Sequence, residues 1–298
     1  MAMNFFDHQE VARRNTGRLV ILFIFAVACI ITAIYFLVAT MLLGEYEGSY
    51  LQYETLGIVT GVSLLLGTLI FLVKVSSLAR GGGVGVADAV GAMEVNPATG
   101  DPGERMYINV VEEMAIASGV PVPGIYILPE ESTINAFAAG YSPKEAVVAV
   151  TRGCIDHLNR DELQGVVAHE FSHIFNGDMR INIRLIGVLS TIVFLAYLGY
   201  IFIRIAGSSG RSRDKEGAGM AAGFFILGLG LLLIGWVGNF FAGLIKAAVS
   251  RQREFLADSS AVQFTRNPEG IAGALRKIGG FGEERLENVK ANEISHMC

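Results

Sequence analysis

Long apolar stretches alternate with polar segments along this chain of 298 residues. Four of these stretches contain no charged residue, and they occupy positions 19–43, 55–73, 185–203 and 217–245. A helix needs about 20 mostly apolar residues to cross the roughly 30 Å of hydrocarbon in a bilayer. The pattern therefore predicts four transmembrane or membrane-embedded helices, arranged as two pairs.

The segments outside these stretches have the pattern of a mixed α+β domain. An amphipathic helix is predicted at 104–118, and short β-like runs follow it at 124–128, 134–139 and 146–151. A glycine-rich segment at 81–85 reads as a flexible or closely packed linker.

These patterns divide the chain into four parts. We expect an N-terminal hairpin at 1–80, a first part of the polar domain at 81–184, a second hydrophobic pair at 185–245, and a second part of the domain at 246–298.

Composition supports a membrane protein and excludes other classes. Apolar residues make up 52% of the chain and charged residues 17%, whereas soluble domains carry about 25% charge. The net charge of −5 argues against a nucleic-acid partner, which needs a basic surface. Three cysteines give no disulfide framework. The first apolar stretch is too long for a signal-peptide core, so we expect a retained anchor.

Basic residues beside the apolar stretches predict the orientation. Three arginines precede the first stretch, Lys74 and Arg80 follow the second, and the loop between these stretches is acidic. Cytoplasmic flanks are enriched in Lys and Arg, so the polar domain should face the cytoplasm. Four basic residues also lie between 204 and 215, so the second pair crosses twice or does not fully cross. Both cases leave 74–184 and 246–298 on one side.

The candidate chemistry lies in a predicted helix at 160–176. Asn159 and Glu162 have the spacing of a capping box, and Gly177 is a helix-ending residue. Inside the helix, His169-Glu170-Phe171-Ser172-His173 is an H-E-x-x-H pattern. Residues i and i+4 share a helix face, so both imidazoles can bind one zinc ion, with Glu170 beside them as general base. A structural metal site is the alternative.

A catalytic zinc ion takes three protein ligands and one open position. Glu254 is the best third candidate, and Asp258 lies one helical turn further on. One of these carboxylates can bind metal while the other accepts the free N–H of a ligating histidine. Alternatively, Glu254 and Asp258 belong to an ordinary charged helix flank, with Arg251 and Arg253 lying beside the membrane. Three isolated residues are rival ligands, namely Cys154, His157 and His296.

Three motifs in this order, separated by the apolar pairs, resemble the HtpX type of integral-membrane zinc metallopeptidases, which are related to the CAAX prenyl proteases. The resemblance rests on Asn135-Ala136-Phe137-Ala138, on 158–178 with its H-E-x-x-H core, and on Arg253-Glu254-Phe255-Leu256-Ala257-Asp258.

The resemblance implies a gluzincin-type fold with a small mixed sheet, and it implies roles for single residues. His169, His173 and Glu254 would bind Zn²⁺, Glu170 would be the catalytic base, and Asp258 would accept a hydrogen bond from His169. The resemblance also assigns substrate binding to an edge segment made of Asn135, Ala136 and Phe137, to which an extended peptide adds as a strand. From the residues alone, Asn135 is a turn residue and Asp178 a helix-end residue.

The function implied is cleavage of damaged or misassembled membrane proteins at the cytoplasmic face of a bacterial inner membrane. Two alternatives remain open, which are CAAX-type processing of lipidated C-termini and a non-catalytic zinc-binding scaffold. Family members continue with a His-Pro-Pro segment that does not occur before Cys298. We therefore expect the chain to be part of a longer protein. The sequence does not indicate an oligomeric state.

Overall fold

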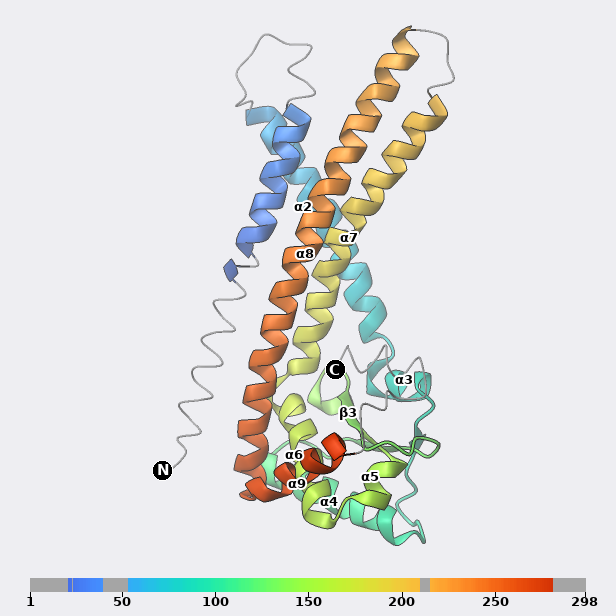
Figure 1. Cartoon of the computed structure of the whole chain (residues 1–298), viewed down its shortest axis with the longest axis vertical. Helices are drawn as coiled ribbons and strands as arrows, with labels where there is room; N and C mark the ends of the chain where they lie inside the picture. The colour runs from blue at the N-terminus through green and yellow to red at the C-terminus, as the bar shows by residue number, and fades with distance from the viewer. Residues whose placement is uncertain (1–20, 23, 40–52, 210–214, 281–298) are drawn as a thin grey trace. The chain divides into compact units, whose positions relative to one another are not determined.

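The computed structural model describes residues 21–22, 24–39, 53–209 and 215–280, which fall into two compact units. The sheet unit contains Ser76–Arg184 and the described residues from Ser250 onward. The helical unit contains the described residues before Ser76 and Leu185–Val249. Figure 1 shows both units, which together form the predicted α+β membrane fold with a small mixed sheet.

The helical unit is built from long apolar helices. Among the described residues, three helices are long and apolar enough to cross a membrane, namely α2 (Tyr53–Ala79), α7 (Asp178–Ser209) and α8 (Lys215–Thr265). A shorter apolar helix spans Ile24–Ala39. The first predicted stretch, 19–43, lies partly outside the described residues. The three long helices agree with the other three predicted stretches.

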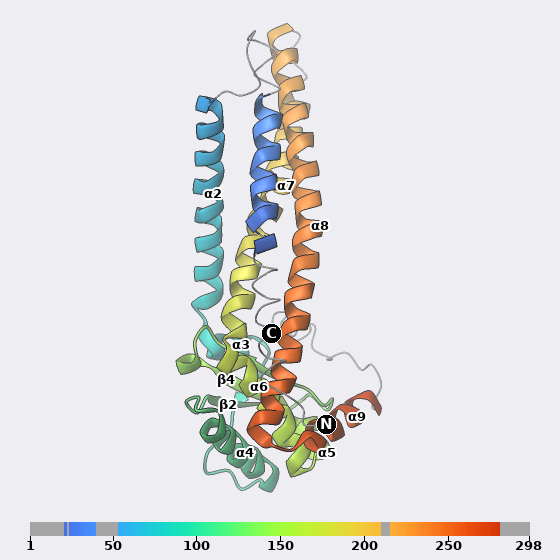
Figure 2. The same cartoon turned by 90° about the vertical axis from the view of Figure 1, so that its left-hand side faces the viewer.

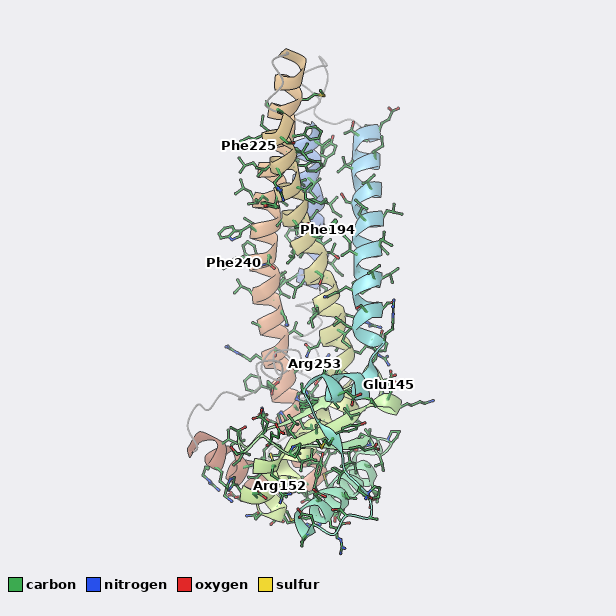
Figure 3. All side chains as sticks on the ribbon, turned by 90° about the vertical axis from the view of Figure 1, so that its right-hand side faces the viewer. Glu145, Arg152, Phe194, Phe225, Phe240 and Arg253 are labelled. Carbon is green, nitrogen blue, oxygen red and sulfur yellow. The ribbon has the colours of Figure 1, made fainter. Side chains whose placement is uncertain are left out.

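Helices α7 and α8 run together as a hairpin (Figures 1 and 2). A Cβ atom added to Gly199 of α7 would lie 2.5 Å from the main-chain oxygen of Gly228 in α8, so small residues permit this close approach. The rings of Phe202 and Phe224 stack between the helices, with centroids 5.8 Å apart. Other aromatic side chains of α8, including the labelled Phe225, project outward in Figure 3, as expected for a surface facing lipid.

Both helices extend further than the apolar stretches predict. The predicted boundary at 245/246 falls inside α8, and α7 begins at Asp178 rather than at 185. The reason is that 246–265 contains no Gly or Pro, so nothing ends the helix where its sequence becomes polar. The candidate ligand Glu254 therefore stands on the same helix as the last apolar stretch.

The sheet unit has one mixed sheet of four strands in the order β1-β2-β4-β3. The strands are β1 (Met93–Glu94), β2 (Gly124–Leu128), β3 (Ala136–Ala139) and β4 (Val147–Thr151). Strands β2 and β4 are parallel, and the other two pairs are antiparallel. All five residues of β4 are buried, whereas β3 is an edge strand. The three predicted β runs are confirmed, and β1 was missed.

Six helices accompany this sheet: α3 (Gly82–Ala89), α4 (Pro102–Ser118), the 3-10 helix η1 (Pro143–Glu145), α5 (Arg152–His157), α6 (Arg160–Asn176) and α9 (Pro268–Gly280). The main core contains Tyr107, Val148, Leu163 and Phe171, all fully buried. The segment 81–85 was interpreted as a linker, but most of it belongs to α3. This helix packs on the sheet because its buried residues are small, such as Gly83 and Ala87.

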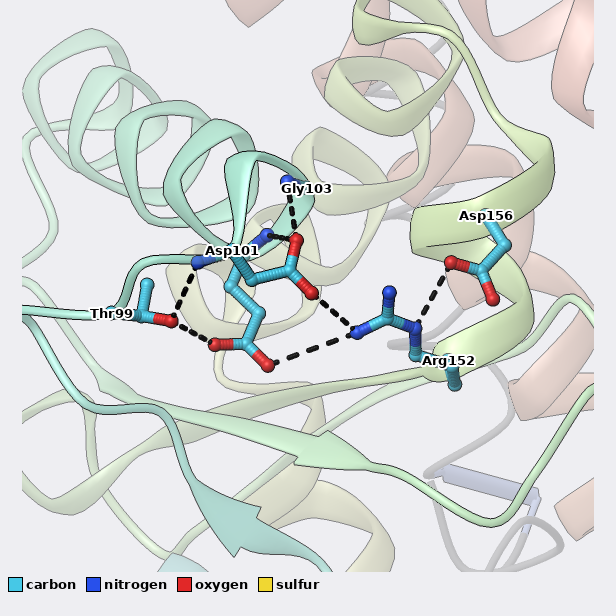
Figure 4. A network of polar contacts seen from close by, with 6 residues as sticks. Thr99, Asp101, Gly103, Arg152 and Asp156 are labelled. Carbon is cyan, nitrogen blue, oxygen red and sulfur yellow. Dashed lines mark hydrogen bonds and ion pairs between the residues drawn. The ribbon is translucent and has the colours of Figure 1, made fainter.

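A polar network ties the start of α5 to the start of α4 (Figure 4). Asp101 caps α4 by accepting a hydrogen bond from the Gly103 N–H at 2.7 Å. The second carboxylate oxygen of Asp101 lies 2.8 Å from Nη1 of Arg152, whose Nε donates to Asp156 at 2.9 Å. Arg152 follows directly after β4, so this network fixes where the central strand ends.

Candidate metal centre

Helix α6 carries the H-E-x-x-H pattern and is bounded by the predicted signals. Oδ1 of Asn159 accepts from the Glu162 N–H at 2.9 Å, and Oε2 of Glu162 accepts from the Asn159 N–H at 2.8 Å. At the other end Gly177 takes the left-handed conformation, with φ of 71°. The capping box and the C-cap therefore set where α6 begins and ends, and the i, i+4 spacing places His169 and His173 on one face of it.

Three side chains from α6 and α8 converge. The Nε2 atoms of His169 and His173 are 3.3 Å apart, and Nε2 of His169 is 3.4 Å from Oε2 of Glu254. All three potential ligand atoms lie within 4.8 Å of one another. Ligands at 2.0–2.1 Å from a tetrahedral zinc ion are separated by about 3.3 Å. The donor set therefore fits a zinc ion in both chemistry and spacing.

A carboxylate stands behind each histidine. Nδ1 of His169 lies 3.0 Å from Oδ1 of Asp258, and Nδ1 of His173 lies 2.8 Å from Oδ2 of Asp178. A carboxylate at Nδ1 keeps the proton there and leaves Nε2 free to bind metal. Asp258 thus faces His169, the arrangement that the resemblance implies. Sequence reasoning missed the contact of Asp178, which it interpreted only as a helix-end residue.

Asp178 also pairs with Arg253, which one of the two alternatives from the sequence places in an ordinary charged flank beside the membrane. Nη1 of Arg253 lies 2.8 Å from Oδ1 of Asp178, and the two side chains are only 15% and 6% exposed. The interpretation as a flank charge is wrong because the guanidinium turns toward the metal centre instead of toward solvent. A buried ion pair thus joins the residue before Glu254 to the carboxylate that faces His173.

These carboxylates control the charge of the metal-free centre. Burial lowers the pKa of His169, but Asp258 and Glu254 more than offset it, and the pKa rises to about 10. For His173, burial likewise lowers the pKa, and Asp178 and Glu170 raise it to a net value above the ordinary one. His169 and burial act in opposite directions on Glu254, whose pKa is lowered. Without metal, the centre therefore holds protons at neutral pH.

Glu170 is buried between the ligand residues, with 9% of its surface exposed. Its carboxylate is close enough to raise the pKa of both His169 and His173. A carboxylate in this place can exchange a proton with a water molecule at the centre.

The predicted substrate segment lies at the sheet edge beside α6. Ala136 and Phe137 begin β3, which packs against α6 and, among the described strands, pairs only with β4. Asn135 directly precedes β3, and its Oδ1 accepts from the Ala136 N–H at 2.8 Å.

The two rival ligands within the described residues, Cys154 and His157, do not join the cluster. Cys154 is buried and its thiol donates to the main-chain oxygen of Asn135. His157 ends α5, where its main-chain oxygen accepts from Lys277. His296 lies outside the described residues. In the described part of the chain, His169, His173 and Glu254 form the set that could hold a metal.

Comparison with known proteins identifies the family of this chain. The profile of Peptidase family M48 matches residues 104–294. The chain is 40% identical to the Protease HtpX homolog of Streptococcus uberis over 172 residues, which cover 58% of this chain and 57% of that protein. It is 39% identical to the Protease HtpX homolog of Thermoanaerobacter pseudethanolicus over 215 residues, covering 70% of this chain and 66% of that protein.

A longer match is found with the Protease HtpX homolog of Leuconostoc citreum, which is 34% identical over 253 residues, or 82% of this chain and 80% of that protein. No solved structure matches the chain. The matched part spans less than two thirds of the Streptococcus and Thermoanaerobacter relatives.

Metal binding should release protons and tighten as the pH rises. His169, with a pKa of about 10, holds a proton in the metal-free chain at neutral pH, and the pKa of His173 is raised, whereas a metal needs neutral imidazoles. We expect about one proton released from His169 per zinc ion at neutral pH, and an affinity that rises about tenfold per pH unit below the pKa of His169. Calorimetry in buffers of different ionisation enthalpy measures both. An affinity independent of pH would contradict the charge assignment.

Replacement of Arg253 by Gln should weaken zinc binding. The change leaves the buried Asp178 carboxylate without its counter-charge, so His173 loses its fixed orientation. We expect the zinc affinity to fall about 10–100-fold, which is the usual effect of disturbing a group that hydrogen-bonds to a metal ligand. Arg251→Gln is the matched control, because it removes the same charge from an exposed position two residues away. Competition with a fluorescent chelator measures both variants, and equal affinities would argue against the Arg253–Asp178 link.

Proposed function

Because the chain belongs to peptidase family M48, we propose that it is an HtpX-type, zinc-dependent endopeptidase that cleaves polypeptides at the centre formed by α6 and α8. The observation that carries this proposal is the convergence of His169, His173 and Glu254 at tetrahedral spacing beside Glu170. A purely structural zinc site would close the coordination sphere with a fourth protein ligand. Among the described residues the set contains three, which supports a centre with one open position.

His169, His173 and Glu254 are proposed to hold the zinc ion. Bound zinc supplies a Lewis acid that polarises a carbonyl oxygen and lowers the pKa of water. Asp258 and Asp178 would hold the Nδ1 protons of the two histidines, so that each Nε2 presents its lone pair. The raised histidine pKa values of the metal-free centre mean that these carboxylates also favour the protonated rings until zinc displaces the protons.

Glu170 is the proposed general base and acid. Its carboxylate would take a proton from the attacking water and then give that proton to the nitrogen of the leaving amine. Its burial supports this role, because a carboxylate shielded from bulk water keeps the proton at the reacting atoms.

Strand β3 is the proposed binding edge for substrate. The Thr151 N–H donates to the Asn135 oxygen. In this register the main-chain groups of Asn135, and of every second residue after it along β3, point toward β4. The main-chain groups of Ala136 and Ala138 consequently point away from β4. Because the Ala136 N–H already donates to Oδ1 of Asn135, the Ala136 oxygen and both main-chain groups of Ala138 are the ones offered at the free edge. An extended polypeptide could add there by main-chain hydrogen bonds that do not depend on its sequence. This mode suits an enzyme that acts on unfolded segments.

The chain is an integral membrane protein, and its described residues include three helices long and apolar enough to span a membrane. We propose that it lies in the bacterial inner membrane, with the centre facing the cytoplasm and damaged or misassembled membrane proteins as substrates. Basic residues beside the N-terminal apolar pair support this orientation. The similarity to proteins named Protease HtpX homolog supports polypeptides as the substrates.

Replacement of Glu170 by Gln should abolish cleavage while the protein keeps its zinc. The amide has nearly the same shape but cannot accept and return a proton, so turnover of unfolded casein should fall about a hundredfold or more. Glu112→Gln, on the exposed face of α4, is the matched control and should cleave like the wild type. Zinc content and casein hydrolysis are measured on the same samples. Wild-type turnover in the Glu170 variant would refute the mechanism.

A further inference from the structure

The segment that leads into β3 lies directly against the start of α5. The Gly153 N–H donates to the Glu131 oxygen at 3.1 Å. A Cβ atom added to Gly153 would lie 2.0 Å from the Ser132 oxygen, so only glycine permits this contact. The Asp101–Arg152 network shown in Figure 4 in turn fixes the start of α5. The segment before β3 therefore rests on a backbone that is itself anchored.

Thr151 makes the central contacts of this anchor. It is the last residue of β4 and only 2% exposed. Its N–H donates to the Asn135 oxygen at 3.0 Å, and its hydroxyl oxygen accepts from the Asn135 N–H, also at 3.0 Å. The same hydroxyl donates to the Thr133 oxygen at 2.5 Å. Because β4 ends at Thr151 and α5 begins at Arg152, the ladder of main-chain hydrogen bonds stops here. The Thr151 hydroxyl takes the place of a main-chain acceptor for the Asn135 N–H.

A second donor lies beside it. The thiol of Cys154 donates to the Asn135 oxygen at 3.0 Å. Burial, and to a smaller extent the nearby Glu170 carboxylate, raise the pKa of this thiol to about 11, so it keeps its proton at neutral pH. Strand β3 also packs against α6, the helix that carries the proposed catalytic base Glu170.

The position of Asn135 determines the register of the free edge. Its main chain is held on the β4 side by Thr151, and its side chain accepts from the Ala136 N–H. A shift of Asn135 would move the outward groups of Ala136 and Ala138 relative to Glu170. Strand pairing places the scissile peptide correctly only if the distance between the β3 edge and Glu170 is fixed. Small displacements of a reacting group are costly in catalysis.

We propose that Thr151 is a positioning residue for substrate: its hydroxyl fixes the Asn135 main chain, and through it the distance between the β3 edge and Glu170. This inference rests on the proposed peptidase function. Thr151 does not touch the substrate or the metal in this account, and it acts through Asn135.

Three variants test the role of the hydroxyl in the zinc-loaded chain. Thr151→Val keeps the shape of the side chain but removes the hydroxyl, and Thr151→Ser restores it. Thr133→Val is the matched control, because the Thr133 hydroxyl is buried and makes no hydrogen bond among the described residues. Casein hydrolysis gives kcat and KM, elemental analysis gives the zinc content, and hydrogen exchange gives the protection of residues 131–139.

We expect Thr151→Val to raise KM and lower kcat, so that kcat/KM falls about tenfold or more while the zinc content is little changed, because the peptide at β3 binds less well and is no longer held at a fixed distance from Glu170. Exchange of the segment 131–139 should accelerate, Thr151→Ser should restore both values, and Thr133→Val should match the wild type. Equal kcat/KM and exchange in Thr151→Val and Thr133→Val would overturn the proposal. If Thr151→Val lost its zinc as well as its kcat, the proposal would also be overturned, because Thr151 would then have a general structural role.

The same experiments distinguish a wrong role for Thr151 from a wrong proposed function. If wild-type casein cleavage does not depend on Glu170, the proposed function is wrong, and hydrogen exchange decides the role of Thr151. Unchanged exchange in Thr151→Val then rejects the anchor, and faster exchange that Thr151→Ser reverses supports it.

Discussion

The metal centre depends on two contacts between a histidine and a carboxylate. Asp258 behind His169 and Asp178 behind His173 determine which nitrogen of each ring is free, and so where the two Nε2 atoms meet. Two imidazoles with Nε2 atoms 3.3 Å apart repel each other when both are protonated, so the carboxylates also balance the charge of the metal-free site. Binding of a zinc ion replaces those protons with one divalent charge.

Continuous helices deliver these groups without loops. Asp178 is the first residue of α7, directly after the left-handed Gly177 that ends α6, and Glu254, Asp258 and Arg253 stand on one helix, α8. The Arg253–Asp178 pair joins the two helices at the centre. A ligand on a helix has fewer conformations available than one on a loop, which favours the fixed geometry that a catalytic metal needs.

The sequence predicts the parts of this centre that depend on local rules. The capping box at Asn159 and Glu162 bounds α6, and i, i+4 spacing places His169 and His173 on one face. The contacts of Asp178 and Arg253 could not be predicted, since each depends on how α7 and α8 meet α6. Strand β1 has two residues, too few for a period-two pattern, and α3 was hidden because its small residues resemble a linker.

Zinc content of the purified chain beside its Glu254→Ala variant tests the three-ligand centre most directly. Glu269→Ala, which removes an exposed carboxylate from α9, is the control. Elemental analysis should find about one zinc ion per chain in the wild type and in the control, and a large loss in Glu254→Ala, because two histidines alone bind zinc weakly. Wild-type zinc content in Glu254→Ala would contradict the assignment of the third ligand.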